Sequence, residues 1–166
     1  QGLPSGGSAT FTWTCTASSA RSYTLGAAIS ATDAVTGAPL SASASPIALT
    51  VQAPASLRAS IAVAGGNPLV VGQPASVTLT VTNGGGAAAN LTAVAASATG
   101  GTGATCATPS PEPPRTVAGG SSEVFTWTCT PAAAGSLVLG ASVSGTDANT
   151  GASLEGTAPG VTRTVV

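Results

Sequence analysis

Short runs in which apolar and polar residues alternate recur along this 166-residue chain, and they predict β-strands. The clearest run covers residues 76–82, where Val and Leu alternate with Ser and Thr. Another run, Phe-Thr-Trp-Thr-Cys-Thr, occurs at residues 11–16 and returns unchanged at 125–130. Successive side chains of a strand point to opposite faces, so Phe, Trp and Cys share one face of this hexapeptide. Because Phe and Trp bury more apolar area than other residues, we expect four core anchors: Phe11, Trp13, Phe125 and Trp127.

Residues 57–166 contain enough such runs for seven or eight strands. Alternating positions start at Leu57 and at Leu137, and the last two strands are expected through Leu154 and through 161–165. The run 90–97 is apolar but weakly patterned, and 98–114 reads as a long loop with one edge strand. Turn chemistry separates the runs, as in Asn83-Gly84-Gly85-Gly86. Short strands at this spacing predict an all-β fold, a two-sheet β-sandwich.

The chain also contains an internal repeat. Sliding the sequence by 114 positions aligns residues 1–52 with 115–166 without a gap, and nearly half of the aligned pairs are identical. The sequence therefore predicts two domains: residues 1–52 form the C-terminal half of one repeat, and 53–166 form a complete repeat of about 114 residues. We call residues 53–114 the front half of the repeat, and residues 115–166 and 1–52 its two back halves. A lone back half would expose strand edges and a core face, so we expect it to need a partner or a preceding segment.

Two stretches of the complete repeat resemble a bacterial immunoglobulin-like surface repeat, the cell-adhesion-related domain of bacteria. Residues 72–85, Gly-Gln-Pro-Ala-Ser-Val-Thr-Leu-Thr-Val-Thr-Asn-Gly-Gly, are similar to its strand and turn pattern G-x-x-x-x-V-x-V-T-V-T-N-x-G. Residues 116–122, before Phe125, are similar to its L-x-x-G-x-S lead into an apolar strand. The resemblance covers 57–166 and the matching half at 1–52. It implies extracellular immunoglobulin-like sandwiches in tandem arrays, and it supplies no catalytic residues.

Composition narrows the function. The chain is 43% apolar but only 5% charged, with a net charge of −1, whereas ordinary globular domains are roughly 25% charged. Nucleic-acid binding and a polybasic membrane patch both need clustered Lys or Arg, so neither is expected. The sequence has no run of 18 apolar residues, so direct membrane insertion is not expected. His and Lys are both absent and no paired carboxylates stand close in sequence, so we expect no enzyme activity and no cofactor. The Ala-, Gly- and Pro-rich usage is typical of a GC-rich bacterial genome.

Three cysteines remain to be placed. Cys106 and Cys129 enclose about two dozen residues of the complete repeat, and we expect a structural disulfide between them, with a pair of buried thiols as the alternative. A disulfide implies an oxidising, extracellular or cell-surface location. Cys15 is the repeat equivalent of Cys129, and the equivalent of Cys106 falls ahead of residue 1. We therefore expect Cys15 to be unpaired, or paired outside the chain. No metal site is expected, because three cysteines without His are too few.

Two other features each have a ligand-binding interpretation and a purely structural one. The Asp33 and Asp147 loops offer hard oxygen ligands for Ca²⁺, but one carboxylate per loop favours ordinary hairpin turns. Trp13 and Trp127 could stack on sugars, but their place between Phe and Cys favours the core.

The most consistent function is structural: a segment of a secreted bacterial stalk, adhesin or filament built from tandem repeats. The partner of residues 1–52 would be a preceding repeat, or another copy of the chain in a head-to-tail homopolymer formed by strand complementation. The rival class is a binding module for polysaccharide or a host surface protein.

Overall fold

The computed structural model describes residues 2–166, and the chain divides into two compact units, Gln1–Val51 and Gln52–Val166. We call them unit 1 and unit 2 and describe each by itself. Both consist of strands, turns and irregular segments.

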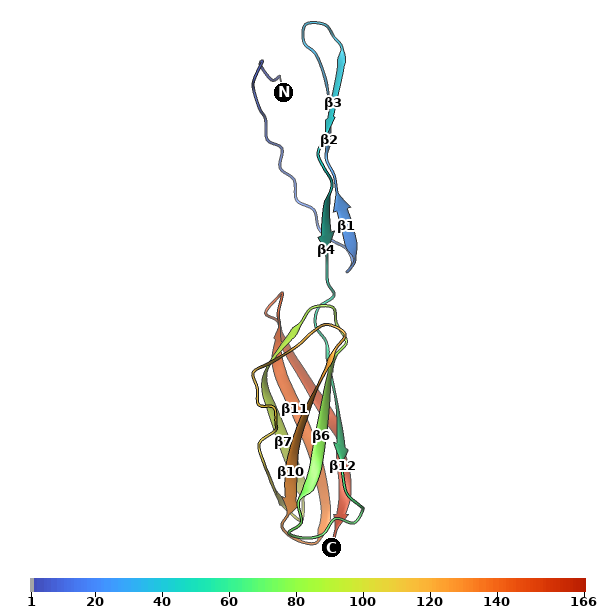
Figure 1. Cartoon of the computed structure of the whole chain (residues 1–166), viewed down its shortest axis with the longest axis vertical. Helices are drawn as coiled ribbons and strands as arrows, with labels where there is room; N and C mark the ends of the chain where they lie inside the picture. Colours follow the sequence, from blue (N-terminus) through green and yellow to red (C-terminus); the bar gives the residue numbers. More distant parts are fainter. Residues whose placement is uncertain (1) are drawn as a thin grey trace. The chain divides into compact units, whose positions relative to one another are not determined.

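Unit 2 is a β-sandwich of two four-stranded antiparallel sheets, which confirms the predicted fold class (Figure 1). The strand order is β5-β6-β10-β8 in one sheet and β12-β11-β7-β9 in the other. The strands are β5 (Leu57–Val63), β6 (Ala75–Asn83), β7 (Ala89–Gly100), β8 (Ala104–Cys106), β9 (Arg115–Val117), β10 (Ser122–Pro131), β11 (Gly135–Asp147) and β12 (Ser153–Val165).

The alternating residues of these strands build the core between the two sheets. Val77, Leu79 and Val81 of β6 are fully buried, while the intervening Thr residues are half-buried. Phe125 and Trp127 of β10 are buried against the same core, as predicted. The facing sheet contributes a matching set from β7 and β11: Leu91, Leu137, Leu139, Ala141 and Val143. Inward-facing residues of both sheets thus interdigitate, as sandwiches require.

One strand prediction for unit 2 is wrong. The expected two last strands are a single strand, β12, which pairs with β11 on both sides of an irregularity between Leu139 and Ala141. Pro159 and Gly160 of β12 lie opposite the single residue Gly140 of β11, so β12 has one additional residue at this bulge. Because β12 lies at the edge of its sheet, a proline there removes no obligatory ladder hydrogen bond. The boundary expected between the two last strands is therefore a bulge within one strand.

Unit 1 contains two short antiparallel pairs: β1 (Ser22–Leu25) with β4 (Ile47–Thr50), and β2 (Ala28–Thr32) with β3 (Pro39–Ser43). Its nine residue pairs have the same register as the equivalent pairs of β11 with β12, at an offset of 114. Ser22 faces Thr50, for example, as Ser136 faces Thr164. The gap between the two short pairs coincides with the position of the bulge in β12.

The hexapeptide at 11–16 is a correction. It forms no strand in unit 1 (Figure 1), and Phe11 and Trp13 are exposed by 58% and 61% rather than anchoring a core. In unit 2 the identical hexapeptide lies in β10, between β6 and β8. Both of those neighbours belong to the front half, and residues 2–51 contain no equivalent of it. A strand without hydrogen-bonding neighbours leaves its ladder groups in water, so the local pattern alone does not create one.

Candidate functional site

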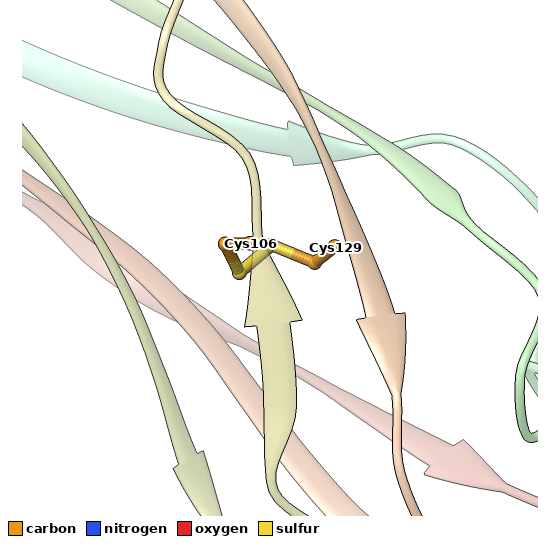
Figure 2. The surroundings of a disulfide bond; sticks show 2 residues. All are labelled: Cys106 and Cys129. Carbon is orange, nitrogen blue, oxygen red and sulfur yellow. A yellow bond between two sulfur atoms is a disulfide. The ribbon is translucent and has the colours of Figure 1, made fainter.

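The two disulfide-forming cysteines lie directly opposite each other on neighbouring strands of unit 2. Cys106 ends β8, Cys129 is on β10, and their Cα atoms are 4.0 Å apart across the pair (Figure 2). Cys129 is 1% exposed, so the bond is attached to the core. β8 has only three residues and occupies a sheet edge. The disulfide therefore ties a short edge strand to the strand that carries Phe125 and Trp127.

Cys15, the repeat equivalent of Cys129, is a free and exposed thiol. Its surroundings are apolar. Two hollows of about 530 and 640 Å³ adjoin Trp13, one beside Cys15 and the other beside Phe11. Both are partly open to solvent and lined mainly by apolar side chains, which come from the irregular segment 9–17, the two short strand pairs and their connections. We call the surface formed by these side chains the open face of unit 1: Phe11, Trp13, Cys15, Leu25, Ile29 and Ile47.

Comparison with unit 2 shows what the open face corresponds to. Phe125, the equivalent of Phe11, is fully buried, and Trp127, the equivalent of Trp13, is 5% exposed. Leu25 and Ile29 are 40% and 45% exposed in unit 1, whereas their equivalents Leu139 and Val143 are buried. The open face thus presents to solvent the positions that are the core of unit 2.

In unit 2, Asn83 fixes the start of the domain. Its amide is fully buried and makes four hydrogen bonds. Its Nδ2 donates to the carbonyls of Ala87 and Val117 at 2.8 and 3.1 Å, and its Oδ1 accepts from the backbone N–H groups of Ser56 and Gly85 at 3.0 Å each. This uses the full capacity of the side-chain amide.

Asp147 fixes the same segment from the other sheet. One carboxylate oxygen accepts from the backbone N–H of Ala55, and the other accepts from Asn149 and Thr150, each at 2.8 Å. The Ala55 N–H is the largest cause that holds the pKa of Asp147 below its usual value, and Thr150 and Asn149 add to it. The Ca²⁺ interpretation loses support here, because both oxygens already face N–H donors rather than a space for a cation.

Asp33, the repeat equivalent of Asp147, caps its own hairpin loop. Its Oδ1 accepts from the backbone N–H groups of Thr36 and Val35 at 2.8 and 2.9 Å, and these bonds, that of Thr36 first, lower the pKa of Asp33. Gly37 follows in the left-handed conformation, with φ of 74°. The same Asx-type turn therefore forms in both units. Asp147 in addition accepts a hydrogen bond from the backbone N–H of Ala55, and among residues 2–51 no corresponding bond to Asp33 is present.

Sequence reasoning identified the Asn83 turn and the Asp147 loop but missed that the two side chains bind Ser56 and Ala55. The signal was limited to turn-forming residue types; the partners lie 27 and 92 positions away. No group of three or more His, Cys, Asp or Glu within residues 2–166 is arranged to hold a metal ion. The carboxylate of Glu123 pairs with exposed Arg115 at 2.7 Å. Within the same residues, the structure has no helix that is long and apolar enough to cross a membrane.

No protein-family model and no curated protein matches this chain. Among solved structures it is similar to the secreted serine protease VesC from Vibrio cholerae, with 20% identity, a TM-score of 0.36, and coverage of 60% of this chain and 23% of that one. It is also similar to domains 4 and 5 of the S-layer protein SbsC, with 22% identity, a TM-score of 0.39, and coverage of 77% and 64%. At these TM-scores we draw no functional conclusion from either likeness.

Proposed function

We propose that this chain is a structural segment of a secreted bacterial surface protein, a stalk, adhesin or filament, built from repeated immunoglobulin-like sandwiches. The observation that carries this proposal is the repeat of one hairpin in two units with identical register at an offset of 114. Repetition of one sandwich-forming unit is how extended proteins gain length without new chemistry.

The disulfide supports an extracellular location, and the contacts of residues 55 and 56 support an array of folded units. Disulfides persist in oxidising compartments, and Cys106–Cys129 ties the short edge strand β8 to the core strand β10. Asn83 and Asp147 bind residues 55 and 56, so the segment that enters unit 2 is part of the folded domain rather than a free linker. Residues 55 and 56 therefore add no flexible linker to an array of such units.

Antibodies against unit 2 test this location on the producing bacterium. We expect labelling of intact cells, loss of that labelling after brief protease treatment, and Cys106 and Cys129 recovered as a disulfide after rapid alkylation. A protein confined to the cell interior, with both thiols alkylated, would refute the proposal.

A second function, a polysaccharide-binding module, is favoured by one observation: Phe11 and Trp13 are exposed aromatic side chains beside two hollows. Aromatic platforms of this kind stack on sugar rings. Glycan arrays probed with the whole chain and with a Trp13→Ala variant test it. Binding lost only in the variant supports the module, and no binding by either protein removes it.

A further inference from the structure

We propose that the open face of unit 1 binds a front-half segment of the type of residues 53–114, continuous with this chain on its N-terminal side, and that the two form a second complete sandwich. The proposal rests on the same repeat as the proposed function, but it does not depend on where the protein is located.

Unit 2 shows how such a segment would cover the open face. In the structure, β10 pairs with β6 so that Phe125 faces Leu79 and Trp127 faces Val77. On its other side β10 pairs with β8, where Cys129 faces Cys106. Each of these partners lies in the front half. A second front half in the same register would place a Leu opposite Phe11 and a Val opposite Trp13.

The short strand pairs of unit 1 have a free edge for the same segment. In unit 2, β11 has β12 on one side and β7 on the other. Among residues 2–166, β1 and β2, which are the equivalents of β11, pair only with β4 and β3. Their second edge therefore offers unpaired backbone groups where a β7-type strand binds in unit 2. The open face and this edge call for the same four-stranded occupant, β5 to β8.

The numbers of front and back halves argue against exchange of a front half between copies of this chain. Residues 1–166 contain two back halves and one front half, and that front half is already packed on residues 115–166 in unit 2. If one copy gave its front half to another, its own unit 2 would lose its cover. Exchange would cover unit 1 of one copy but uncover residues 115–166 of another, so the occupant must be an additional front half.

The connection also fits. In unit 2 the front half runs into the back half through the irregular segment 107–114, which is held by one bridge from Ser110 to Thr126, and then through β9. A front half ahead of Gln1 would meet the open face in the same way. It would bring a cysteine opposite Cys15, as Cys106 stands opposite Cys129. Formation of that bond would transfer two electrons and two protons from the two thiols to an external disulfide, which is reduced to two thiols.

The test adds the missing half to the full chain. A fusion carries a copy of residues 53–114, the donor, directly ahead of Gln1, and is folded in a glutathione redox buffer. The unfused chain has one free thiol, Cys15. We expect the fusion to have none after folding, a mass-spectrometric cross-link between Cys15 and the donor cysteine, and a blue shift of the Trp13 emission in a Trp127→Phe background.

The matched control changes only the donor, replacing its copies of Val77, Leu79 and Val81 with Thr. These changes keep β-propensity but remove the core face, so Cys15 should stay reactive toward a thiol reagent and Trp13 should stay solvent-exposed. If the fusion does not fold in one piece, the donor is supplied as a separate polypeptide to the full chain, and the mixed disulfide is compared with that of a Cys15→Ser variant.

Two outcomes would overturn the proposal. One is a donor that leaves Cys15 reactive and Trp13 exposed both in the fusion and as a separate polypeptide. The other is an unfused chain that dimerises with Trp13 already buried, which would make a second copy the occupant. Neither outcome bears on cell-surface labelling, so this proposal and the proposed function fail separately.

Discussion

The buried amide of Asn83 gives the sharpest test of how unit 2 is held together. Replacing it with Ala removes four hydrogen bonds at a site with no solvent exposure. Two of the orphaned groups, the N–H groups of Ser56 and Gly85, lie near the surface and can bind water. The other two, the carbonyls of Ala87 and Val117, belong to residues that are 1% and 2% exposed.

The loss of stability expected for Asn83→Ala comes from those two carbonyls. A buried polar group left without a partner costs about 1–3 kcal/mol, so the two carbonyls together should lower the free energy of unfolding of unit 2 in Asn83→Ala by about 2–6 kcal/mol. Small domains are stable by about 5–15 kcal/mol, so this is a large fraction. For a unit of this size it corresponds to a fall in Tm of roughly 10 °C or more.

Urea unfolding followed by Trp127 fluorescence measures the change. A Trp13→Phe background makes Trp127 the only tryptophan, and it disturbs no core because Trp13 is exposed. Asn149→Ala is the matched control: the exposed amide of Asn149 donates only to Gln52, so we expect a change within about 0.5 kcal/mol.

Asn83→Asp adds a charge to the same test. At neutral pH its carboxylate faces two carbonyls that need donors, so this variant should be at least as unstable as Asn83→Ala. It should recover stability as the pH falls and the carboxyl gains a proton to donate. Equal stabilities of Asn83→Ala and Asn149→Ala would refute the role assigned to Asn83.

Three further predictions concern unit 2. Replacing both Cys106 and Cys129 with Ala should lower its free energy of unfolding by about 3 kcal/mol in urea, and an unchanged midpoint would mean that the disulfide constrains nothing. Because hydrogen bonds lower the folded-state pKa of Asp147, its carboxylate stabilises the fold above about pH 4, and that stability is lost as the pH falls through the folded pKa. Asp147→Asn should therefore unfold more easily than the natural chain at pH 7 and approach it at acid pH, whereas Asp33→Asn should leave the unfolding of unit 2 unchanged at both. Gly85→Ala should destabilise unit 2 by about 1–3 kcal/mol, since a Cβ there would meet the carbonyl of Pro54, and a stabilised variant would contradict that contact.

Alternation and turn chemistry were sufficient to predict the sandwich. The period-two pattern of Val77, Leu79 and Val81 predicted β6, and the pattern of Leu57–Val63 predicted β5, because burial of one face is written directly into such runs. The pairing of Cys106 with Cys129 also followed from sequence, because these two cysteines enclose about two dozen residues of one complete repeat, whereas Cys15 belongs to the other.

Long-range polar contacts were not predictable in this way. Asn83 and Asp147 each had the residue type of a turn, and nothing local indicates that their side chains bind residues 55 and 56. The bulge in β12 was missed for a related reason. Pro159-Gly160 signals a break by composition, and only its place on a sheet edge allows the strand to continue.

The repeated hexapeptide separates local propensity from tertiary context within one chain. Residues 11–16 and 125–130 have the same sequence, yet one copy is an exposed irregular segment and the other is a buried strand. β-propensities span only about 1 kcal/mol, whereas burying one Phe or Trp is worth roughly 2–3 kcal/mol. The neighbouring strands of the front half supply that burial and the ladder hydrogen bonds together. Because the front half determines whether this hexapeptide is a strand, one complete sandwich needs one front half for each back half, and adding the front half should convert residues 11–16 from an irregular segment into a strand.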